Sequence, residues 1–310
     1  MFVAFKGCNL LVINHFIQFI SRYNYTRKFS SNSSDRPINY YLAGLIEGDG
    51  HFNVPKSLKS ISGKNTYAGI EVVFALKDLP SAEFLKNMIG GNIYIRLDKN
   101  AVRWVIQDKK TITYLVNCIN GKLRTPKINY FYNLIDYLNA KGDNIIKLPL
   151  DNSPLNSNAW LAGFIDSDGN FSIKGFTSNN LRTYLGFQFY LPQRAIDVSG
   201  VSLTYIMQNL ADYLNCKLLF RTFKEGFTQY VVNTSSKESN KILIDYLNTY
   251  PLLSSKYLDF KNWEKALNLY VLKLHRDPKY LEEIRNLKLS MNNNRSIFNW
   301  EHLNHPVYKS

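Results

Sequence analysis

The 310-residue chain has few cysteines, few acidic residues and no long apolar run. Its cysteines, Cys8, Cys118 and Cys216, stand apart from one another and from any histidine cluster. This isolation argues against a disulfide framework and a zinc site, and indicates a reducing compartment or buried thiols. No apolar stretch is long enough to span a bilayer, so no membrane partner is expected.

Acidic residues number 24 against 38 lysines and arginines, which gives a formal net charge of +14. On a folded chain such an excess favours a polyanionic partner, either nucleic acid or an anionic membrane surface. Without a membrane segment, nucleic acid is preferred. The hydrophobic fraction of 45% indicates a folded protein, and the length is sufficient for two domains with cores of their own.

One stretch of the sequence occurs twice. Residues 42–50 read LAGLIEGDG, and residues 161–169 read LAGFIDSDG. A single Asp-x-Asp-Gly is ordinary turn chemistry, but two long matches in register are specific. Each copy predicts an apolar helix that ends at a glycine, Gly50 or Gly169, in the left-handed conformation.

Small residues inside the two predicted helices indicate that the helices pack against each other. Glycine costs about 1 kcal/mol relative to alanine in a helix, so Gly44 and Gly163 are explained if two backbones approach closely. A pseudo-twofold pair would bring Asp49 and Asp168 together at the negative ends of both helix dipoles. Two carboxylates there repel each other unless cations such as Mg²⁺ lie between them. The alternative, two solvated helix-end acids, leaves the glycines unexplained.

The same order of elements is expected after each motif. The first repeat predicts strands at 51–54 and 67–76, a helix at 80–89, strands at 92–98 and 101–107, and helices at 111–119 and 128–138. The second predicts strands near 170–173 and 182–190, a helix at 203–214, strands at 217–223 and 228–232, and helices at 237–247 and 258–272.

The expected domains follow from this duplication. They are a leader at 1–36, a first repeat at 37–138, a linker rich in Asn, Pro, Gly and Asp at 139–158, a second repeat at 159–274, and a C-terminal helical extension at 275–310. The extension has no counterpart in the first half, and the sequence gives it no role. Its histidines, His302 and His305, are expected at the surface rather than as metal ligands.

The duplicated motif resembles that of the LAGLIDADG homing endonucleases, in their single-chain form with two motif copies, over roughly residues 37 to 270. The resemblance implies an α+β fold in which two pseudo-symmetric αββαββα repeats form a saddle of antiparallel sheets, joined at a seam of two motif helices. It implies a monomer that binds double-stranded DNA at a specific site, cuts both strands with Mg²⁺ and mobilises its own intron.

The resemblance also implies roles for the motif acids. Asp49 and Asp168 match the family's metal-binding acids, which would share two or three Mg²⁺ ions. Glu47 and Asp166, two residues earlier, match structural acids near the seam and are not expected to bind metal.

Three further residues match catalytic positions of the family. Lys127 and Lys256, at corresponding places in the two repeats, resemble the active-site lysine that stabilises charge near the scissile phosphate. The alternative for each is a surface lysine at a helix start. Gln193 resembles the glutamine that positions water; the first repeat has Leu76-Lys77 there, so the site is expected to be asymmetric.

Polar side chains alternate with apolar ones along the predicted strands. A sheet with arginine and glutamine on its open face can read base edges in a major groove, although a plain solvated face is an equal alternative. The candidate DNA-binding residues are Arg96, Arg103, Gln107, Arg182, Gln188 and Arg221.

The leader contains no acid before Asp35 and is rich in Arg and Ser near its end, as in organellar transit peptides. A remnant of an upstream reading frame and an extra core-covering helix are the alternatives; the first two indicate a mitochondrial protein.

The alternative function is an RNA maturase that helps the host intron to splice, alone or in addition to cleavage. Both motif acids and both lysines are present, which favours cleavage, because RNA binding needs neither. A DNA-binding regulator without nuclease activity would be expected to have lost an acid.

Overall fold

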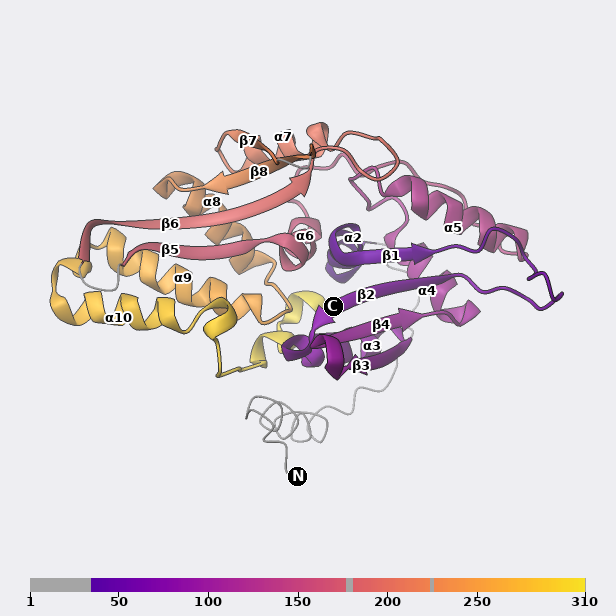
Figure 1. Cartoon of the computed structure of the whole chain (residues 1–310), viewed down its shortest axis with the longest axis horizontal. Coiled ribbons are helices and arrows are strands. Elements are labelled where there is room, and N and C mark those ends of the chain that lie inside the picture. Colours follow the sequence, from indigo (N-terminus) through magenta and orange to yellow (C-terminus); the bar gives the residue numbers. More distant parts are fainter. Residues whose placement is uncertain (1–34, 177–180, 224–225, 310) are drawn as a thin grey trace, which may run out of the picture.

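The computed structural model describes residues 35–309 except 177–180 and 224–225, so the predicted leader lies almost wholly outside the described residues. Two four-stranded antiparallel sheets extend from a central pair of helices, each covered by helices on one side (Figure 1). This is the predicted α+β fold of two repeats. No helix of the described residues is long and apolar enough to cross a membrane.

The first repeat begins with the motif helix and ends with two helices in succession. Its elements are α2 (Pro37–Asp49), β1 (Gly50–Asn53), β2 (Gly69–Ala75), the 3₁₀ turn η1 (Leu76–Asp78), α3 (Leu79–Ile89), β3 (Asn92–Arg96), the 3₁₀ turn η2 (Leu97–Lys99), β4 (Ala101–Ile106), α4 (Lys109–Ile119) and α5 (Ile128–Ala140). The strands pair in the order β1-β2-β4-β3.

The second repeat follows the same plan. Its elements are α6 (Trp160–Asp168), β5 (Asn170–Phe176), β6 (Leu181–Arg194), α7 (Thr204–Tyr213), β7 (Leu218–Thr222), β8 (Thr228–Thr234), α8 (Lys237–Thr249) and α9 (Lys256–Val271). The order β5-β6-β8-β7 repeats that of the first sheet. Strand β6 continues past Tyr190 through Pro192, which is tolerated because β5 pairs only as far as Tyr190 and one side is open there.

The two motif helices pack backbone against backbone, as the glycines predict. A Cβ atom placed on Gly44 would lie 2.0 Å from the carbonyl oxygen of Trp160, and one on Gly163 would lie 1.9 Å from that of Tyr41. Any side chain at either position would push the helices apart. The contact is therefore reciprocal and joins the two repeats through α2 and α6.

The prediction that Gly50 and Gly169 end the helices in the left-handed conformation is wrong. Both are extended, with φ of −81° and −73°, and each N–H still donates to the carbonyl four residues earlier, of Ile46 or Ile165. Glycine is needed for space, because a Cβ would lie 2.6 Å or 2.8 Å from that same oxygen. The chain can thus pass directly from helix to strand, which fixes each motif acid at the root of a sheet.

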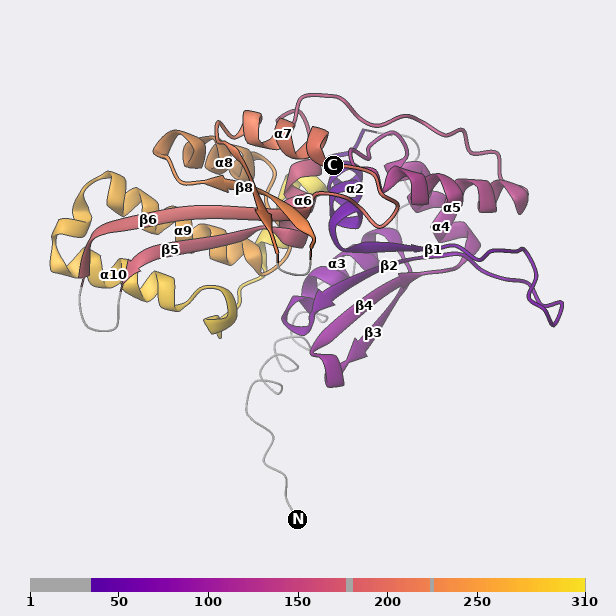
Figure 2. The ribbon, with the colours of Figure 1, turned by 45° about the horizontal axis from the view of Figure 1, so that its top comes forward.

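Two irregular segments return to the seam. After α5, residues 141–159 cross back to the start of α6 (Figure 2). After α9, the chain forms η3 (Leu274–Arg276), α10 (Pro278–Leu289), η4 (Asn292–Asn294), η5 (Glu301–Asn304) and η6 (Pro306–Tyr308), and it ends beside α2 (Figure 1). The expectation of a surface position for His302 is wrong, because its side chain is buried against Leu253 and the ring of Tyr257.

Candidate functional site

The last residues of the two motif helices, Asp49 and Asp168, form the centre of the candidate site. Oδ2 of Asp168 lies 3.1 Å from the point where a Cβ on Gly48 would stand, so its carboxylate reaches across the seam to the first motif. Burial and the negative charge of Asp168 raise the pKa of Asp49 to about 6, against the opposing effect of Lys256 and Lys127. The structure therefore brings the two predicted metal-binding acids together.

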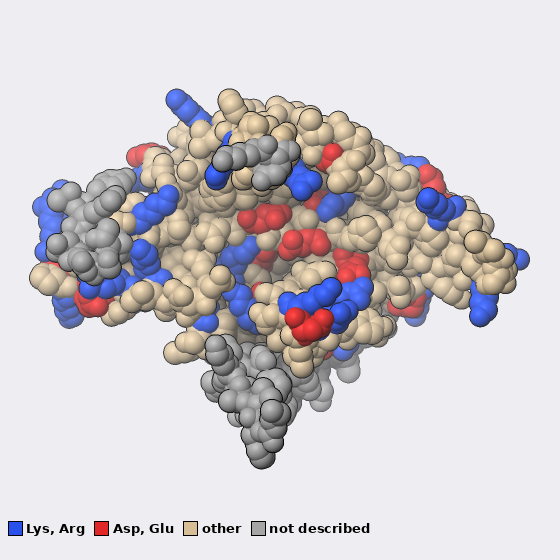
Figure 3. Space-filling model, viewed as in Figure 1, with Lys and Arg blue, Asp and Glu red and all other residues tan. Residues whose placement is uncertain are grey.

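Acidic side chains gather in a hollow at the middle of the face seen in Figure 3, with lysine and arginine on its flanks. Asp49 and Asp168 supply oxygen ligands of the kind that hard divalent cations prefer, and a cation would relieve their repulsion. Within the described ranges, no group of three or more His, Cys, Asp or Glu side chains could hold a metal ion. The remaining ligands of an ion would then be water and substrate oxygens.

Lys127 and Lys256 point their ammonium groups at the ends of the motif helices. The acceptors are the carbonyl oxygens of Ile46, Gly48 and Gly50 for Lys127 (3.1, 3.2 and 2.9 Å) and those of Ile165, Asp166 and Ser167 for Lys256 (3.1, 2.8 and 3.0 Å). Burial lowers the pKa of both lysines, and nearby carboxylates oppose this shift. The surface alternative is wrong for both, because each ammonium group is turned inward onto backbone carbonyls at the C-terminal end of a motif helix, where the helix dipole favours a cation.

Glu47, the sixth-position acid of the first motif, is buried within the seam. Its carboxylate accepts hydrogen bonds from the backbone N–H groups of Arg124 and Thr125, from the Thr125 hydroxyl and from the Trp160 indole. Burial raises its pKa to about 7, although these donors act in the opposite direction. Glu47 therefore joins the segment before Lys127 to the other repeat.

Asp166 makes the matching contacts in the second motif. It accepts from the N–H groups of Leu253 and Ser254, at 2.6 and 3.1 Å, from the Ser254 hydroxyl, and from the Tyr41 hydroxyl at 2.6 Å. All its partners lie in the segment before Lys256 or in the first repeat. The pair of sixth-position acids thus links the repeats crosswise.

The carboxylates of the two motif aspartates have different surroundings. Gln193 donates to Oδ2 of Asp168 at 2.8 Å, and the Ser167 hydroxyl donates to the same atom at 3.2 Å. In the part of the chain that the structure describes, no hydrogen-bond donor reaches the carboxylate of Asp49. The predicted asymmetry of the site is therefore present in its hydrogen bonds.

The position corresponding to Gln193 follows from strand register. Asn170 pairs with Tyr190 as His51 pairs with Glu71. Three residues further along each strand, Gln193 corresponds to the buried Phe74, so the assignment of Leu76-Lys77 to this place is wrong. The alternation continues without a bulge up to both residues, which makes this equivalence firm.

The candidate DNA-binding residues whose side chains are described lie on the open faces of the sheets, but not all are free. Arg103 pairs through two nitrogens with Glu71 (2.5 and 2.6 Å), and Arg96 pairs with Asp98. Gln107 is exposed just after β4, and Gln188 is half-buried on β6. Arg221 is exposed on β7 beside the ring of Phe223, and the side chain of Arg182 lies outside the described residues.

Sequence reasoning missed Arg194. This exposed residue and Arg221 both pair in register with Gln229 on β8, so the three side chains form a polar row across the second sheet. The alternation through Gln188, Tyr190 and Pro192 predicts that Arg194 lies on the same face. The predicted strand stops short of Arg194 because a proline usually indicates the end of a strand.

These features define a protein of two pseudo-symmetric sheet repeats with a pair of carboxylates at the junction. The sequence profile of the family described as "LAGLIDADG endonuclease" matches residues 42–138 and 161–267. The chain belongs to this family.

Curated relatives agree with this assignment. The chain is 31% identical to the intron-encoded DNA endonuclease aI3 of Saccharomyces cerevisiae, with 95% of this chain and 85% of that protein covered. It is 28% identical to the intron-encoded RNA maturase bI4 of the same yeast, with 87% of this chain and 38% of that protein covered. The crystal structure of the LAGLIDADG homing endonuclease I-GzeII in complex with its DNA target has the same fold, with a TM-score of 0.66 and 19% identity over 83% of this chain and 99% of that one.

Proposed function

We propose that the chain is a sequence-specific, Mg²⁺-dependent DNA endonuclease that cuts both strands of the intronless insertion site of its own intron. The observation that carries this proposal is the pairing of Asp49 and Asp168 at the ends of two helices in contact. A DNA-binding role alone would not require two mutually repelling carboxylates side by side at the ends of the motif helices.

The residues around this pair support hydrolysis of a phosphodiester. Asp49 and Asp168 would hold the ions, which supply a water of lowered pKa and neutralise the leaving oxygen. Gln193 holds the Asp168 carboxylate and can orient a water beside it. Lys127 and Lys256 fix the ends of the motif helices and place a positive charge near the developing negative charge.

The open sheet faces supply the binding surface for double-stranded DNA. Arg194, Gln229 and Arg221 form one side-chain row that can reach base edges, and exposed Gln107 directly follows β4 of the other sheet. Phosphate contacts by the basic surface would add affinity without sequence information. Because both motif copies belong to one chain, a monomer contains the whole site.

The test is cleavage of a duplex that joins the two exon sequences flanking the intron, with Mg²⁺ and, separately, with Ca²⁺ to measure binding. We expect double-strand cutting by the intact chain, and its loss in Asp49→Asn and Asp168→Asn with binding retained. Asp136→Asn is the matched control, since Asp136 forms a surface ion pair with Lys147. Binding without cutting by the intact chain would refute the endonuclease.

The second candidate function, a maturase, is favoured by the similarity to RNA maturase bI4 and by the charge of +14. The same preparation should then bind its host intron RNA and accelerate splicing in vitro. Splicing that persists in Asp49→Asn would make the maturase an activity independent of the acids. No RNA binding at physiological salt would exclude it.

We also propose the domain division expected from the sequence and a mitochondrial location. The intron-encoded relatives and the acid-poor leader support this location. Subcellular fractionation with an antibody against residues 275–310 tests it. An antibody against residues 1–36 on the same blots would show whether the leader is removed.

A further inference from the structure

Each repeat carries its lysine at the end of an irregular segment. We call these lysine segment 1, residues 122–127, and lysine segment 2, residues 251–256. In each segment, backbone N–H groups donate hydrogen bonds to the sixth-position acid of the same repeat's motif. Each segment then leads into the last helix of its repeat, α5 or α9. The position of each segment therefore sets where its lysine meets the end of the motif helix.

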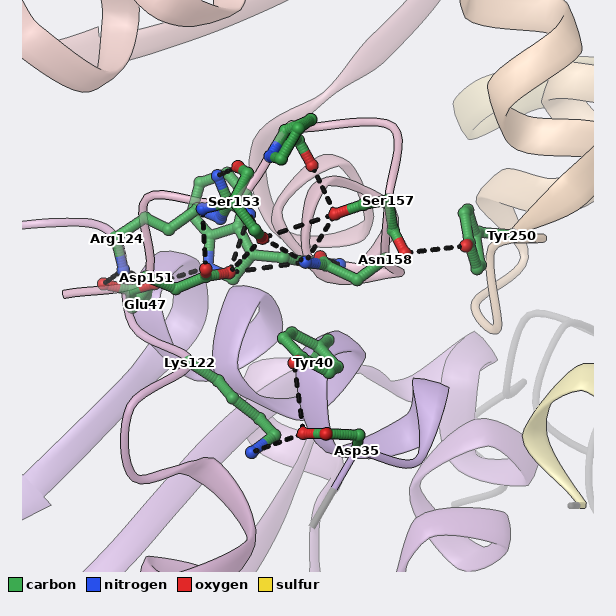
Figure 4. A network of polar contacts seen from close by, with 12 residues as sticks. Asp35, Tyr40, Glu47, Lys122, Arg124, Asp151, Ser153, Ser157, Asn158 and Tyr250 are labelled. Atoms are coloured by element: carbon green, nitrogen blue, oxygen red, sulfur yellow. Dashed lines mark hydrogen bonds and ion pairs between the residues drawn. The ribbon is translucent and has the colours of Figure 1, made fainter. Parts of the chain in front are cut away.

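The linker contacts lysine segment 1 through Asp151 and Ser153, which bind Arg124 (Figure 4). The N–H of Asp151 donates to the carbonyl of Leu123 at 2.8 Å. The guanidinium of Arg124 donates to Asp151 and to both the carbonyl and the hydroxyl of Ser153, and it lies over the ring of Trp160. Arg124 and Asp151 are 5% and 10% exposed, so this is a buried ion pair that only the returning linker completes.

The C-terminal tail, residues 290–309, also holds its lysine segment, here through side chains that contact the backbone carbonyls of segment 2. The hydroxyl of Tyr308 donates to the carbonyl of Pro251 at 2.8 Å, and His302 Nε2 lies 3.2 Å from the carbonyl of Leu253. The ring of Tyr308 meets that of Tyr41 edge-on, with centroids 5.4 Å apart. Tyr308 thus touches both the segment of the second repeat and the motif helix of the first.

The tail is itself firmly attached to the second repeat. The carboxylate of Asp259 on α9 accepts from the N–H of Asn292 and from Arg295, in an ion pair that is 4% and 8% exposed. Met291 and Leu303 are buried with it. By contrast, Ile297 in the same tail is exposed, so it offers a control position.

The two segments correspond in topology as well as in contact. The linker follows α5, and the tail follows the equivalent helix α9 after α10. Each returns to the seam: the linker continues directly into Trp160, over which Arg124 of lysine segment 1 lies, and the tail places Tyr308 against Tyr41. In this respect the extension does have a counterpart in the first half of the molecule, although its sequence shows none.

From these contacts we propose that the C-terminal tail is the second repeat's counterpart of the linker, and that Tyr308 is a positioning residue for the half of the nuclease centre that contains Lys256. The proposal rests on the proposed endonuclease function. Tyr308 acts through Pro251 and Tyr41, and at 1% exposure its side chain is not open to a bound duplex. Its loss should change the geometry of one half of the centre and leave DNA binding intact.

The experiment compares Tyr308→Ala, Tyr308→Phe and the control Ile297→Ala, using a duplex labelled on both strands. In single turnover we expect Tyr308→Ala to slow cutting of one strand by about tenfold to a hundredfold, so that nicked DNA accumulates. Tyr308→Phe keeps the ring against Tyr41 and should recover much of the rate. The Kd for uncut duplex in Ca²⁺ should stay within about threefold of the intact chain.

A linker variant tests the corresponding contact in the first repeat. Arg124→Leu introduces the residue that stands at the matching place, Leu253, and removes the ion pair with Asp151. It should accumulate a nick on the opposite strand. Equal slowing of both strands in Tyr308→Ala, or a rise in Kd as large as the fall in rate, would overturn the proposal.

A measurement without catalysis separates this inference from the proposed function. Hydrogen exchange of the Leu253 and Ser254 amides, which donate to Asp166, should be faster in Tyr308→Ala and unchanged in Ile297→Ala. If the intact chain cuts no DNA, the proposed endonuclease function is refuted, but hydrogen exchange still tests whether Tyr308 positions lysine segment 2. Unchanged exchange in both Tyr308 variants would refute the positioning role.

Discussion

The phenol of Tyr41, in the first repeat, donates a hydrogen bond of 2.6 Å to the carboxylate of Asp166, in the second. The reverse link joins Trp160 to Glu47. Each buried acid also holds the segment that carries its own repeat's lysine. The seam is therefore both a packing contact and the part that aligns the two halves of the site.

The first prediction concerns Glu47→Gln. Because the pKa of Glu47 rises from 4.5 to about 7 on folding, the folded state binds a proton that the unfolded state has lost between these pH values. The free energy of unfolding should fall as pH rises through this window, by up to about 3 kcal/mol for this group. Glu47→Gln should flatten that fall in urea titrations at pH 5 to 8, whereas the exposed Glu238→Gln should not. Equal slopes for the two variants would contradict the prediction.

The second prediction tests the helix contact with Gly44→Ala. The added methyl would meet the Trp160 carbonyl, so we expect a loss of about 1–3 kcal/mol or more, with cleavage reduced because the motif acids move apart. Gly142→Ala is the comparison, since nothing lies within 4 Å of its new Cβ and only its φ of +96° opposes alanine. Thermal melts and cleavage assays should separate the two: Gly142→Ala should lose some stability and keep its cleavage rate.

Features that depend on neighbours along the chain could be predicted from the sequence. The motif helices, their close contact at Gly44 and Gly163, and most strands follow from periodicity and from the cost of glycine in a helix. The end of β6 could not be predicted in this way. Pro192 argues against a strand, and only the pairing pattern shows that β5 ends before it and leaves one side of β6 open.

Features that join distant parts of the chain carry no such signal. Nothing in the spacing of Lys127 shows that its ammonium group meets three carbonyls around the junction of α2 and β1. The linker's ion pair with Arg124 and the return of Tyr308 to Tyr41 are equally non-local. Long-range polar contacts of this kind depend on the assembled fold, and local propensity says little about them.

The third prediction concerns Lys256→Met. Removal of this charge takes away an interaction that lowers the pKa of Asp49, so the pKa should rise further. The acidic limb of the single-turnover pH–rate profile should move to higher pH, and the rate on its plateau should fall by about tenfold or more. Lys261→Met, which removes a surface ion pair with Glu264, should leave the profile unchanged. A lower rate with an unmoved acidic limb would assign Lys256 a purely structural role.

The fourth prediction concerns DNA recognition by the second sheet. Arg194→Ala should weaken binding of the target duplex by about 1–3 kcal/mol if its side chain contacts a base, with relaxed preference at one position of the site. A phosphate contact would instead weaken all sequences equally and lower the salt slope by about one. Competition binding against single-position variants of the site, repeated at several salt concentrations, distinguishes these. No change in either measurement would exclude Arg194 from the interface.

The last prediction follows from the unequal surroundings of the two motif acids. Asp168 is held by Gln193 and Ser167, whereas the register equivalent of Gln193 beside Asp49 is the buried Phe74. We expect the intact chain to cut its two strands at different rates, because among the described residues a side-chain amide reaches the carboxylate of Asp168 and none reaches that of Asp49. Gln193→Leu should remove this advantage and bring the two rates closer, by slowing the faster strand about tenfold or more. Time courses with both strands labelled give the two rates. If Gln193→Leu slows the strand that is already slower, the amide serves the opposite half of the centre from the one its hydrogen bond to Asp168 indicates.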